Sequence, residues 1–298
     1  MALPDEIRAA CARVAAAARH VGIVEAAIAP YAATIAPAPR EPAEQPYADA
    51  ESGAAHLLQL DAVNFGSGWF PTLRKPPGLS GFRTVEAGLL ARGPWRAGEL
   101  DGIGAAECAA VFGQDPGHPL MALFAAALDE LGAVVRHEHD GAFLALARAG
   151  DGSAVALAER LAGLPTWADV SLHSGAAVPL FKRAQLAAAD LHRHGIAPAG
   201  DLGALTLMAD NLVPHVLRLD GVLRFDPALV ARIDRGELLE HGSPEEVEIR
   251  ACAVHAVELL VAAHGATTAA AVDDVLWRRG GAARYKAHPR HRARTTAY

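Results

Sequence analysis

Cysteine is scarce in this sequence, with Cys11, Cys108 and Cys252 as the only examples in 298 residues. The three lie far apart and form no C-x-x-C pair, so the sequence predicts neither a disulfide framework nor a thiolate metal site. Aromatic residues make up 5% of the chain, and much of the 52% hydrophobic content is alanine. Because alanine favours helices and is a poor strand former, the composition predicts a mainly α fold.

Long apolar runs and an excess of basic charge are lacking too. The first twenty residues carry charges throughout, which is unlike a signal peptide or membrane anchor, so we expect a cytoplasmic protein without a membrane partner. The net charge of −7 argues against stable nucleic-acid binding. Basic residues do gather near the C-terminal end, in a local patch that suits a small anion: Arg278, Arg279, Arg284, Lys286, Arg290, Arg292 and Arg294.

Several common catalytic signatures are absent. The sequence contains no G-x-G-x-x-G, no G-x-x-x-x-G-K-[ST] and no G-x-S-x-G, which disfavours hydride transfer on a dinucleotide, P-loop hydrolysis and a serine nucleophile. The stretch RHEHD supplies His137 and His139, but it is not H-E-x-x-H and no third ligand is indicated. We therefore expect neither a metal nor a cofactor.

Helical periodicity dominates what is present. Apolar residues recur at three and four over residues 4–29, again in a short segment at 56–65, and through most of the chain from Phe82 onward. Prolines break the pattern in the loop after Ala29, and Gly and Pro make 66–81 irregular. Residues 133–150 fit a strand or a helix. Ser243 and Glu246 form an S-x-x-E capping box that predicts a helix start.

We find no internal repeat of 20–50 residues. The sequence therefore predicts a mainly α, single domain over residues 1–298 with few short strands, or two closely packed helical lobes at 1–165 and 166–298.

One polar and aromatic mixture lies in the Gly- and Pro-rich stretch VNFGSGWFPT. Aromatic faces with polar groups beside them suit the binding of a flat heterocycle. A core loop anchored by its aromatics is the structural alternative, which these residues alone favour slightly. The residues concerned are Asn64, Phe65, Ser67, Trp69, Phe70 and Thr72.

Two helical stretches carry charges close to their apolar stripes. Lys182 in LFKRAQLAAADL could project into a cleft, although a solvated surface lysine is the ordinary alternative. Glu248 in EEVEIRACAVHAVELL falls near one face with His255, and a buried glutamate there would need a partner or a ligand. His255 itself is more often a satisfied core histidine.

Asp210 is an ionisable residue within the apolar run LTLMADNLVPHVLRLDGVLRF. Aspartate is a favoured N-cap and proline is accepted in a first turn, so Asp210 could cap a helix that carries Pro214. A catalytic carboxylate is the alternative, and both roles can be held by one residue.

Several motifs in a single order resemble the queuosine salvage proteins, the queuosine 5′-phosphate N-glycosylases. The family pattern F-x-K-R-A-Q is matched by Lys182, Arg183, Ala184 and Gln185, and L-T-x-x-A-D-x-x-V-P-Q-V-L by Leu205, Thr206, Ala209, Asp210, Val213, Pro214, Val216 and Leu217. E-E-V-E-I-R-x-C is matched at 245–252, and H-R-x-R-x-x-x-Y by His291, Arg292, Arg294 and Tyr298. His215 departs from the glutamine that is common in the family.

The resemblance implies an all-α fold, similar to the helix-hairpin-helix DNA glycosylases, and hydrolysis of the N-glycosidic bond of queuosine 5′-monophosphate to release queuine. It implies catalytic roles for Asp210 and Lys182. It also implies substrate binding by two groups: a base pocket of Asn64, Phe65, Ser67, Trp69 and Phe70, and a further set of Glu248, Arg250, His291, Arg292, Arg294 and Tyr298, whose tail members would hold the 5′-phosphate.

Two other functions stay open from the sequence. One is a non-catalytic protein that binds a modified base or nucleotide. The other is a glycosylase that acts on bases within DNA or RNA, against which the acidic net charge counts. In each case no cofactor is expected, and the favoured partner is a small nucleotide.

Overall fold

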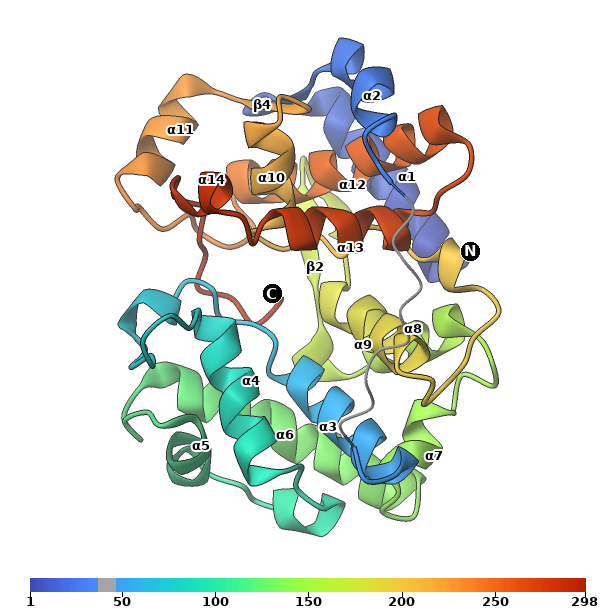
Figure 1. Ribbon diagram of the computed structural model, residues 1–298, viewed down its shortest axis with the longest axis vertical. Helices are drawn as coiled ribbons and strands as arrows, with labels where there is room; N and C mark the ends of the chain where they lie inside the picture. The colour runs from blue at the N-terminus through green and yellow to red at the C-terminus, as the bar shows by residue number, and fades with distance from the viewer. Residues whose placement is uncertain (37–46) are drawn as a thin grey trace. The chain divides into compact units, whose positions relative to one another are not determined.

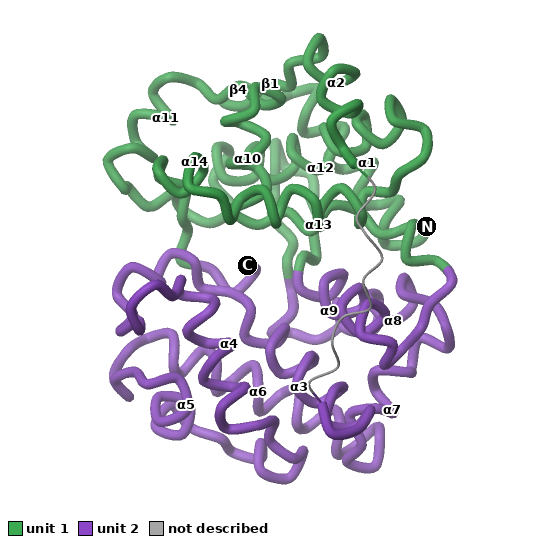
Figure 2. Tube along the Cα trace, viewed as in Figure 1, with its two compact units in different colours: residues 1–41, 169–182, 201–294 green, residues 42–168, 183–200, 295–298 purple. Residues whose placement is uncertain are grey.

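A computed structural model describes residues 1–36 and 47–298. The chain forms two compact units, each assembled from separate stretches of sequence (Figure 2). Unit 1 comprises residues 1–41, 169–182 and 201–294, and unit 2 comprises 42–168, 183–200 and 295–298. The N-terminal residues thus join C-terminal stretches in unit 1.

Unit 1 is built around one long helix, α12, which contacts α1, α2, α10 and α13 (Figure 1). Two short antiparallel sheets complete the unit: β1 pairs with β4, with Val21 opposite Phe225, and β2 pairs with β3, with Val170 opposite Pro179. The elements are α1 (Leu3–Ala17), β1 (Val21–Ile23), α2 (Glu25–Ala32), β2 (Val170–His173), β3 (Ala176–Pro179), a 3-10 turn (Leu202–Ala204), α10 (Val213–Leu219), β4 (Leu223–Phe225), α11 (Pro227–Asp234), α12 (Pro244–His264), α13 (Ala269–Arg279) and α14 (Ala283–Lys286).

Unit 2 is helical throughout its regular structure. Its core holds a chain of edge-to-face aromatic contacts, in which Phe124 lies 5.1 Å from Phe65 and 5.4 Å from Phe112 between ring centroids. The elements are α3 (Ala50–Ala62), α4 (Gly81–Arg92), α5 (Ala105–Phe112), α6 (Pro119–Glu138), α7 (Phe143–Ala147), α8 (Ala154–Ala162) and α9 (Lys182–Arg193), with 3-10 turns at Phe70–Thr72, Ala97–Leu100 and Pro165–Trp167. The first residue of α9, Lys182, is counted with unit 1.

The mainly α fold and the scarcity of strands are confirmed. The irregular stretch at 66–81 is confirmed apart from its 3-10 turn, and residues 133–150, left open as strand or helix, are the end of α6 followed by α7. The helix start at Ser243 is confirmed, since its side chain accepts the N–H of Glu246. The predicted loop after Ala29 begins later, after α2, and its residues 37–46 lie outside the described residues.

The prediction of one continuous helix over residues 4–29 is wrong. Helix α1 ends at Ala17, and the chain then enters β1 before α2 begins. The physical reason is tertiary: the N–H groups of Arg19, His20 and Val21 donate to the carboxylate of Glu248 instead of to helical carbonyls. The helical pattern of side chains is present, but these long-range partners override it.

Within the described ranges, no single helix is both long and apolar enough to cross a bilayer. One bent pair, α12 with α13, reaches that length and composition together across a bend of 111°. Most of α12 is buried inside unit 1, as is common for a central core helix.

Candidate active site

Helix α12 buries three charged side chains within a span of five residues: Glu246, Glu248 and Arg250. Charges removed from water need partners, because an unpaired ion inside a protein is strongly destabilising. Each of the three meets a different part of unit 1. Of the three, Arg250 reaches the backbone beside the predicted catalytic residue Asp210.

Arg250 is completely buried and makes the most extensive of these contacts. Its Nη1 and Nη2 donate to the two carboxylate oxygens of Asp169, at 2.8 and 2.7 Å, in a bidentate ion pair. Its Nε donates to the backbone carbonyl of Ala209 at 3.0 Å. The guanidinium therefore fixes the peptide that immediately precedes Asp210.

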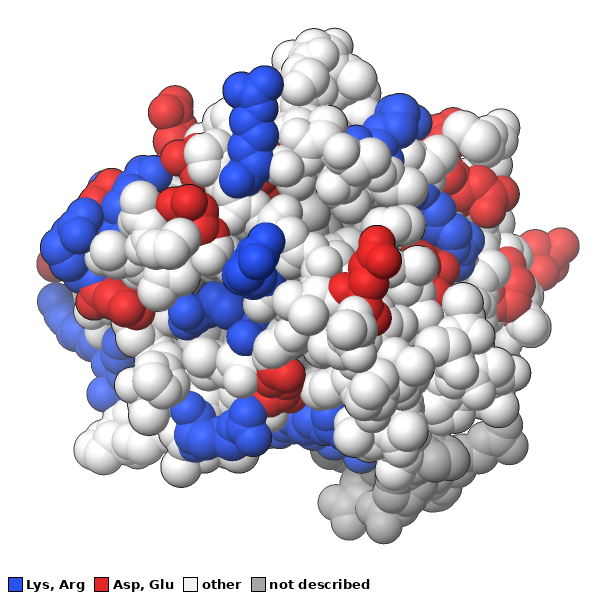
Figure 3. Space-filling view, turned by 90° about the horizontal axis from the view of Figure 1, so that it is seen from above, with Lys and Arg blue, Asp and Glu red and all other residues white. Residues whose placement is uncertain are grey.

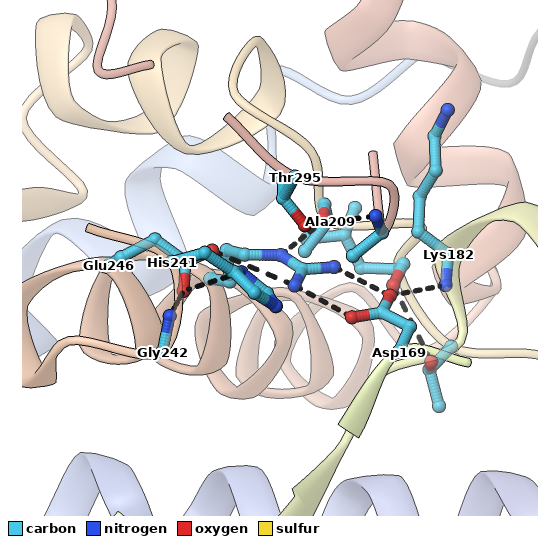
Figure 4. Close-up of polar contacts among 11 residues, drawn as sticks. Asp169, Lys182, Ala209, His241, Gly242, Glu246 and Thr295 are labelled. Carbon is cyan, nitrogen blue, oxygen red and sulfur yellow. Dashed lines mark hydrogen bonds and ion pairs between the residues drawn. The ribbon is translucent and has the colours of Figure 1, made fainter. Parts of the chain in front are cut away.

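Glu246 approaches the same guanidinium from one turn earlier in α12, with Oε1 at 3.7 Å from Nη1 of Arg250. Its other oxygen accepts the N–H of Gly242 at 3.0 Å and lies 3.5 Å from Nδ1 of His241. Burial raises the pKa of this carboxyl, but the bonding to His241 and the charge of Arg250 outweigh it and bring the pKa to about 2. Figure 4 shows Glu246 between His241 and Gly242.

Glu248 points to the N-terminal strand of the unit. One of its oxygens accepts three successive backbone N–H groups, from Arg19, His20 and Val21, at 3.0, 2.6 and 3.1 Å. The other lies 3.3 Å from Nε2 of His173 in β2. These contacts support the fold, and contact of Glu248 or Arg250 with a substrate stays a prediction.

Lys182 is positioned by the same ion pair. The Oδ2 atom of Asp169 accepts the N–H of Lys182 at 2.9 Å, and the backbone carbonyl of Asp169 accepts that of Leu180 at 2.9 Å. Between them Phe181 has φ = 46°, an uncommon conformation for a non-glycine residue that is often found near functional sites. The Lys182 side chain extends away from Asp169 (Figure 4).

Asp210 is half-buried and lies just before α10. Its Oδ1 accepts the N–H groups of Leu212 and Val213, at 2.6 and 3.2 Å, and so fixes the turn that leads into α10. The N-cap residue of α10 is Leu212, so the prediction of Asp210 as the N-cap is wrong. Among the described residues, the second oxygen of Asp210 makes no hydrogen bond. One oxygen therefore holds the carboxylate in place, and a catalytic role for the other stays a prediction.

The C-terminal basic stretch runs past the start of α10. The side-chain amide of Asn211 donates to the backbone carbonyl of His291 at 3.3 Å, and the N–H of Leu239 donates to the carbonyl of Arg292 at 2.9 Å. Arg292 is half-buried and Arg294 is exposed, whereas His291 is buried. The two arginines of the predicted phosphate set are thus more accessible to solvent than His291.

Burial lowers the pKa of His291 to about 4, although the charges of Glu246 and Asp210 act in the opposite direction. Burial lowers the pKa of His215 to about 4 as well. Nε2 of His215 lies 2.9 Å from the backbone carbonyl of Tyr285, so that nitrogen carries the proton and donates to it. Both histidines are neutral at pH 7, and neither supplies a positive charge for a phosphate there.

In unit 2, the predicted base-pocket residues do not share one environment. Phe65 is buried, and the guanidinium of Arg183 lies over its ring at 4.9 Å from the centroid. Arg183 also donates to the backbone carbonyl of Ala62 at 2.6 Å and to that of Thr166. Phe65 is therefore a core residue, as the structural alternative expected, while Asn64, Trp69 and Phe70 are partly exposed.

Ser67 follows Gly66, at which any other residue would be strained. Gly66 has φ = 97°, and a Cβ there would meet Cδ1 of Leu120 at 2.6 Å. The Gly66 N–H donates to the carbonyl of Tyr298 at 2.9 Å, which places Tyr298 beside this segment of unit 2. The Ser67 hydroxyl is buried and has no hydrogen-bond partner among the described residues. A ligand that could bond this oxygen would remove the cost of leaving it unsatisfied.

Asp169 is the main residue that the sequence did not single out. It lies in no recognised motif, and only the need of a buried Arg250 for a carboxylate could have indicated it. In the parts of the chain that the structure describes, no group of three or more His, Cys, Asp or Glu side chains is arranged to hold a metal ion.

Comparison with known proteins assigns the chain to a family. A family model described as queuosine salvage protein matches residues 90–298, well over half of the sequence. The chain belongs to the queuosine salvage protein family. The resemblance seen in the sequence motifs is thereby confirmed. The matched range includes Lys182, Asp210, Arg250 and the basic tail, and Asn64–Phe70 precede it.

Individual relatives agree with this assignment. A protein of Sphaerobacter thermophilus named queuosine 5′-phosphate N-glycosylase/hydrolase is 35% identical over 274 residues, which cover 83% of this chain and 82% of the relative. Proteins of the same name from Bos taurus and Mus musculus are 33% and 31% identical over 138 and 147 residues. Those two alignments cover 45% and 48% of this chain, and 40% and 44% of the relatives.

Proposed function

We propose that this protein hydrolyses the N-glycosidic bond of queuosine 5′-monophosphate and releases queuine for reuse in tRNA modification. The names of its relatives and its family membership support the activity. The structural observation that carries the proposal is the state of Asp210, a half-buried carboxylate with one oxygen fixed by α10 and the other unengaged by the described residues.

The reaction requires little beyond such a carboxylate and water. As the bond between the base and C1′ breaks, its electron pair leaves with the base, and positive charge develops over C1′ and the ring oxygen of the ribose. A nearby carboxylate stabilises that charge, more strongly where water is excluded. Water supplies hydroxide to C1′ and a proton to the base, which gives queuine and ribose 5-phosphate.

The chain's residues take these parts in the proposal. Asp210 stabilises the developing charge or orients the water, and Lys182 assists near the ribose or the phosphate. Asn64, Ser67, Trp69 and Phe70 contact the base, with Phe65 behind them, and Arg292, Arg294, His291 and Tyr298 remain the predicted phosphate ligands. Arg250 and Glu248 serve mainly by holding the backbone, as their contacts indicate. We place the reaction in the cytoplasm and assign it no cofactor.

Two other functions are distinguished by experiment. A binding protein for a modified base or nucleotide would hold the same ligand without turnover. A glycosylase acting within DNA or RNA would need a continuous basic surface. On the face shown in Figure 3, basic side chains are interrupted by acidic and uncharged ones.

The direct test is to incubate the purified protein with queuosine 5′-monophosphate and to measure queuine and ribose 5-phosphate by mass spectrometry. We expect both products in equal amounts. Tight binding without products over hours would favour the binding protein instead. Release of bases from an oligonucleotide, with affinity that falls steeply with salt, would favour the nucleic-acid glycosylase.

A further inference from the structure

Helix α10 ends on a carboxylate that helix electrostatics disfavour. Asp220 is the C-cap residue of this helix, so its charge lies at the end where the helix dipole is negative. The backbone already completes the turn, because Gly221 has φ = 78° and the N–H of Val222 donates to the carbonyl of Leu217 at 2.9 Å. The helix end therefore does not need the Asp220 side chain, and its presence calls for another explanation.

Three donors surround the Asp220 carboxylate. The phenol of Tyr31 in α2 donates to it at 2.7 Å, and the phenol of Tyr285 in α14 donates to both of its oxygens, at 2.9 and 3.0 Å. Arg284 adds an ion pair. The Asp220 side chain is only 8% exposed, so these donors replace most of its water. Burial, with the hydrogen bond to Asp220, raises the pKa of both phenols, which therefore keep their protons at pH 7.

Tyr285 also bonds α10 at a second point. Nε2 of His215, near the start of the helix, donates to the backbone carbonyl of Tyr285 at 2.9 Å. His215 and Asp220 are separated by about 7.5 Å along a helix axis. One residue of α14, which lies beside α10 (Figure 1), thus holds the short helix through its main chain at one point and through its phenol at the other. Two separated bonds restrain both sliding and tilting of the helix.

The start of α10 connects this clamp to the predicted catalytic carboxylate. Oδ1 of Asp210 accepts the N–H groups of Leu212 and Val213, so a displacement of the helix also displaces the groups that hold the carboxylate. On the other side of Asp210, Arg250 fixes the carbonyl of Ala209. The orientation of the carboxylate therefore depends on two supports, α12 before it and α10 after it.

We propose that Tyr285 is a positioning residue, which clamps α10 at His215 and Asp220 and so keeps the Asp210 carboxylate in the orientation that bond cleavage needs. The effect on base release rests on the proposed function, whereas the clamp itself does not. Tyr285 acts through α10 and not through the substrate, so its loss lowers the rate of cleavage and leaves substrate binding intact.

Hydrogen exchange tests the clamp without turnover, because the N–H groups of Leu212 and Val213 report whether the Asp210 carboxylate stays in place. For Tyr285→Phe we expect both amides to exchange at least about tenfold faster than in the wild type. Tyr31→Phe is the matched control, since it removes a phenol from the same carboxylate and leaves both contacts of Tyr285; its two amides should exchange as in the wild type. Equal acceleration in both variants, or none in Tyr285→Phe, would overturn the inference.

Single-turnover release of queuine from queuosine 5′-monophosphate gives a second readout. Tyr285→Phe should be at least about tenfold slower with KM nearly unchanged, and Tyr31→Phe should keep the wild-type rate. His215→Leu removes the other half of the clamp and should also be slow. His215→Gln, whose amide can still donate to the Tyr285 carbonyl, should restore the rate. A raised KM with a wild-type rate in Tyr285→Phe would overturn the inference.

The His215 pair keeps the test decisive if Tyr285→Phe does not fold. In that case, equal exchange at Leu212 and Val213 in His215→Leu and His215→Gln would overturn the inference. A wild type that releases no queuine, with variants that show the expected exchange, would leave the clamp standing and would contradict the proposed function.

Discussion

Asp169 and Arg250 form a fully buried, bidentate ion pair that holds two stretches of backbone at once. Asp169 accepts the N–H of Lys182, and Arg250 donates to the carbonyl of Ala209. The two residues predicted to be catalytic, Lys182 and Asp210, are therefore tied to one rigid pair through their own main chain. Such support is what a site needs if its groups are to keep a productive geometry.

Arg250→Met should destabilise the protein strongly, because it leaves the Asp169 carboxylate buried without its counter-charge. We expect a loss of about 3–5 kcal/mol, measured by urea unfolding. The double variant Asp169→Leu with Arg250→Met removes both charges and should be less destabilised than Arg250→Met alone. Arg232→Met, which breaks partly exposed ion pairs with Glu237 and Glu245, is the control and should cost about 1 kcal/mol or less. A double variant that is less stable than Arg250→Met alone would contradict this account.

Stability should fall as the solution is acidified from pH 6.5 toward pH 4. Burial lowers the pKa values of His56, His215 and His291 from 6.5 to about 4. In that window the unfolded chain takes up protons that the folded chain does not, so acid favours unfolding.

His215→Gln is the matching variant, since its amide can still donate to the carbonyl of Tyr285 but does not titrate. Melting temperatures from pH 7.5 to 4.5 should show a shallower decline for His215→Gln than for the wild type. His137→Gln, which changes an exposed histidine, should follow the wild type. Parallel curves for all three proteins would show that His215 does not contribute.

Ser67→Ala should separate stability from binding. The hydroxyl is buried without a partner among the described residues, so its removal should leave the melting temperature unchanged or raise it slightly. If the hydroxyl bonds the base, KM for queuosine 5′-monophosphate should rise about tenfold. Thr72→Val is a useful comparison, because that hydroxyl already donates to the carbonyl of Trp69. An unchanged KM in Ser67→Ala would remove Ser67 from the base pocket.

Much of the fold could be predicted from local patterns. These predictions hold in the segments where helical periodicity and capping residues agree with the tertiary contacts. Helix α12 begins at Ser243, where the capping box predicted, whereas α10 begins two residues later than the predicted N-cap at Asp210. The break after Ala17 was missed because it depends on Glu248, more than two hundred residues away in sequence, which accepts the N–H groups of Arg19, His20 and Val21. The spacing of apolar residues along a short segment gives no information about such a distant partner.

The candidate site, too, could be predicted from local motifs only in part. Motif order identified Lys182 and Asp210 as residues of interest, and the family assignment supports that choice. Motif order could not show that Asp169 supports the backbone at both residues, since a single aspartate between a helix and a strand has no local signature. Nor could the motif H-R-x-R reveal that His291 is buried while Arg290 and Arg292 are half-buried, because that depends on the tertiary contacts of the tail.

The central claim is that the ionised carboxylate of Asp210 drives cleavage of the glycosidic bond, and Asp210→Asn tests it most directly. Asparagine keeps an oxygen that can accept the N–H groups of Leu212 and Val213, whereas Asp210→Ala loses both hydrogen bonds at a cost of about 1 kcal/mol. We predict that Asp210→Asn melts like the wild type and still binds ribose 5-phosphate. Its single-turnover release of queuine from queuosine 5′-monophosphate should be slower by about 10²–10³-fold or more. Release within a few-fold of the wild-type rate would contradict the account.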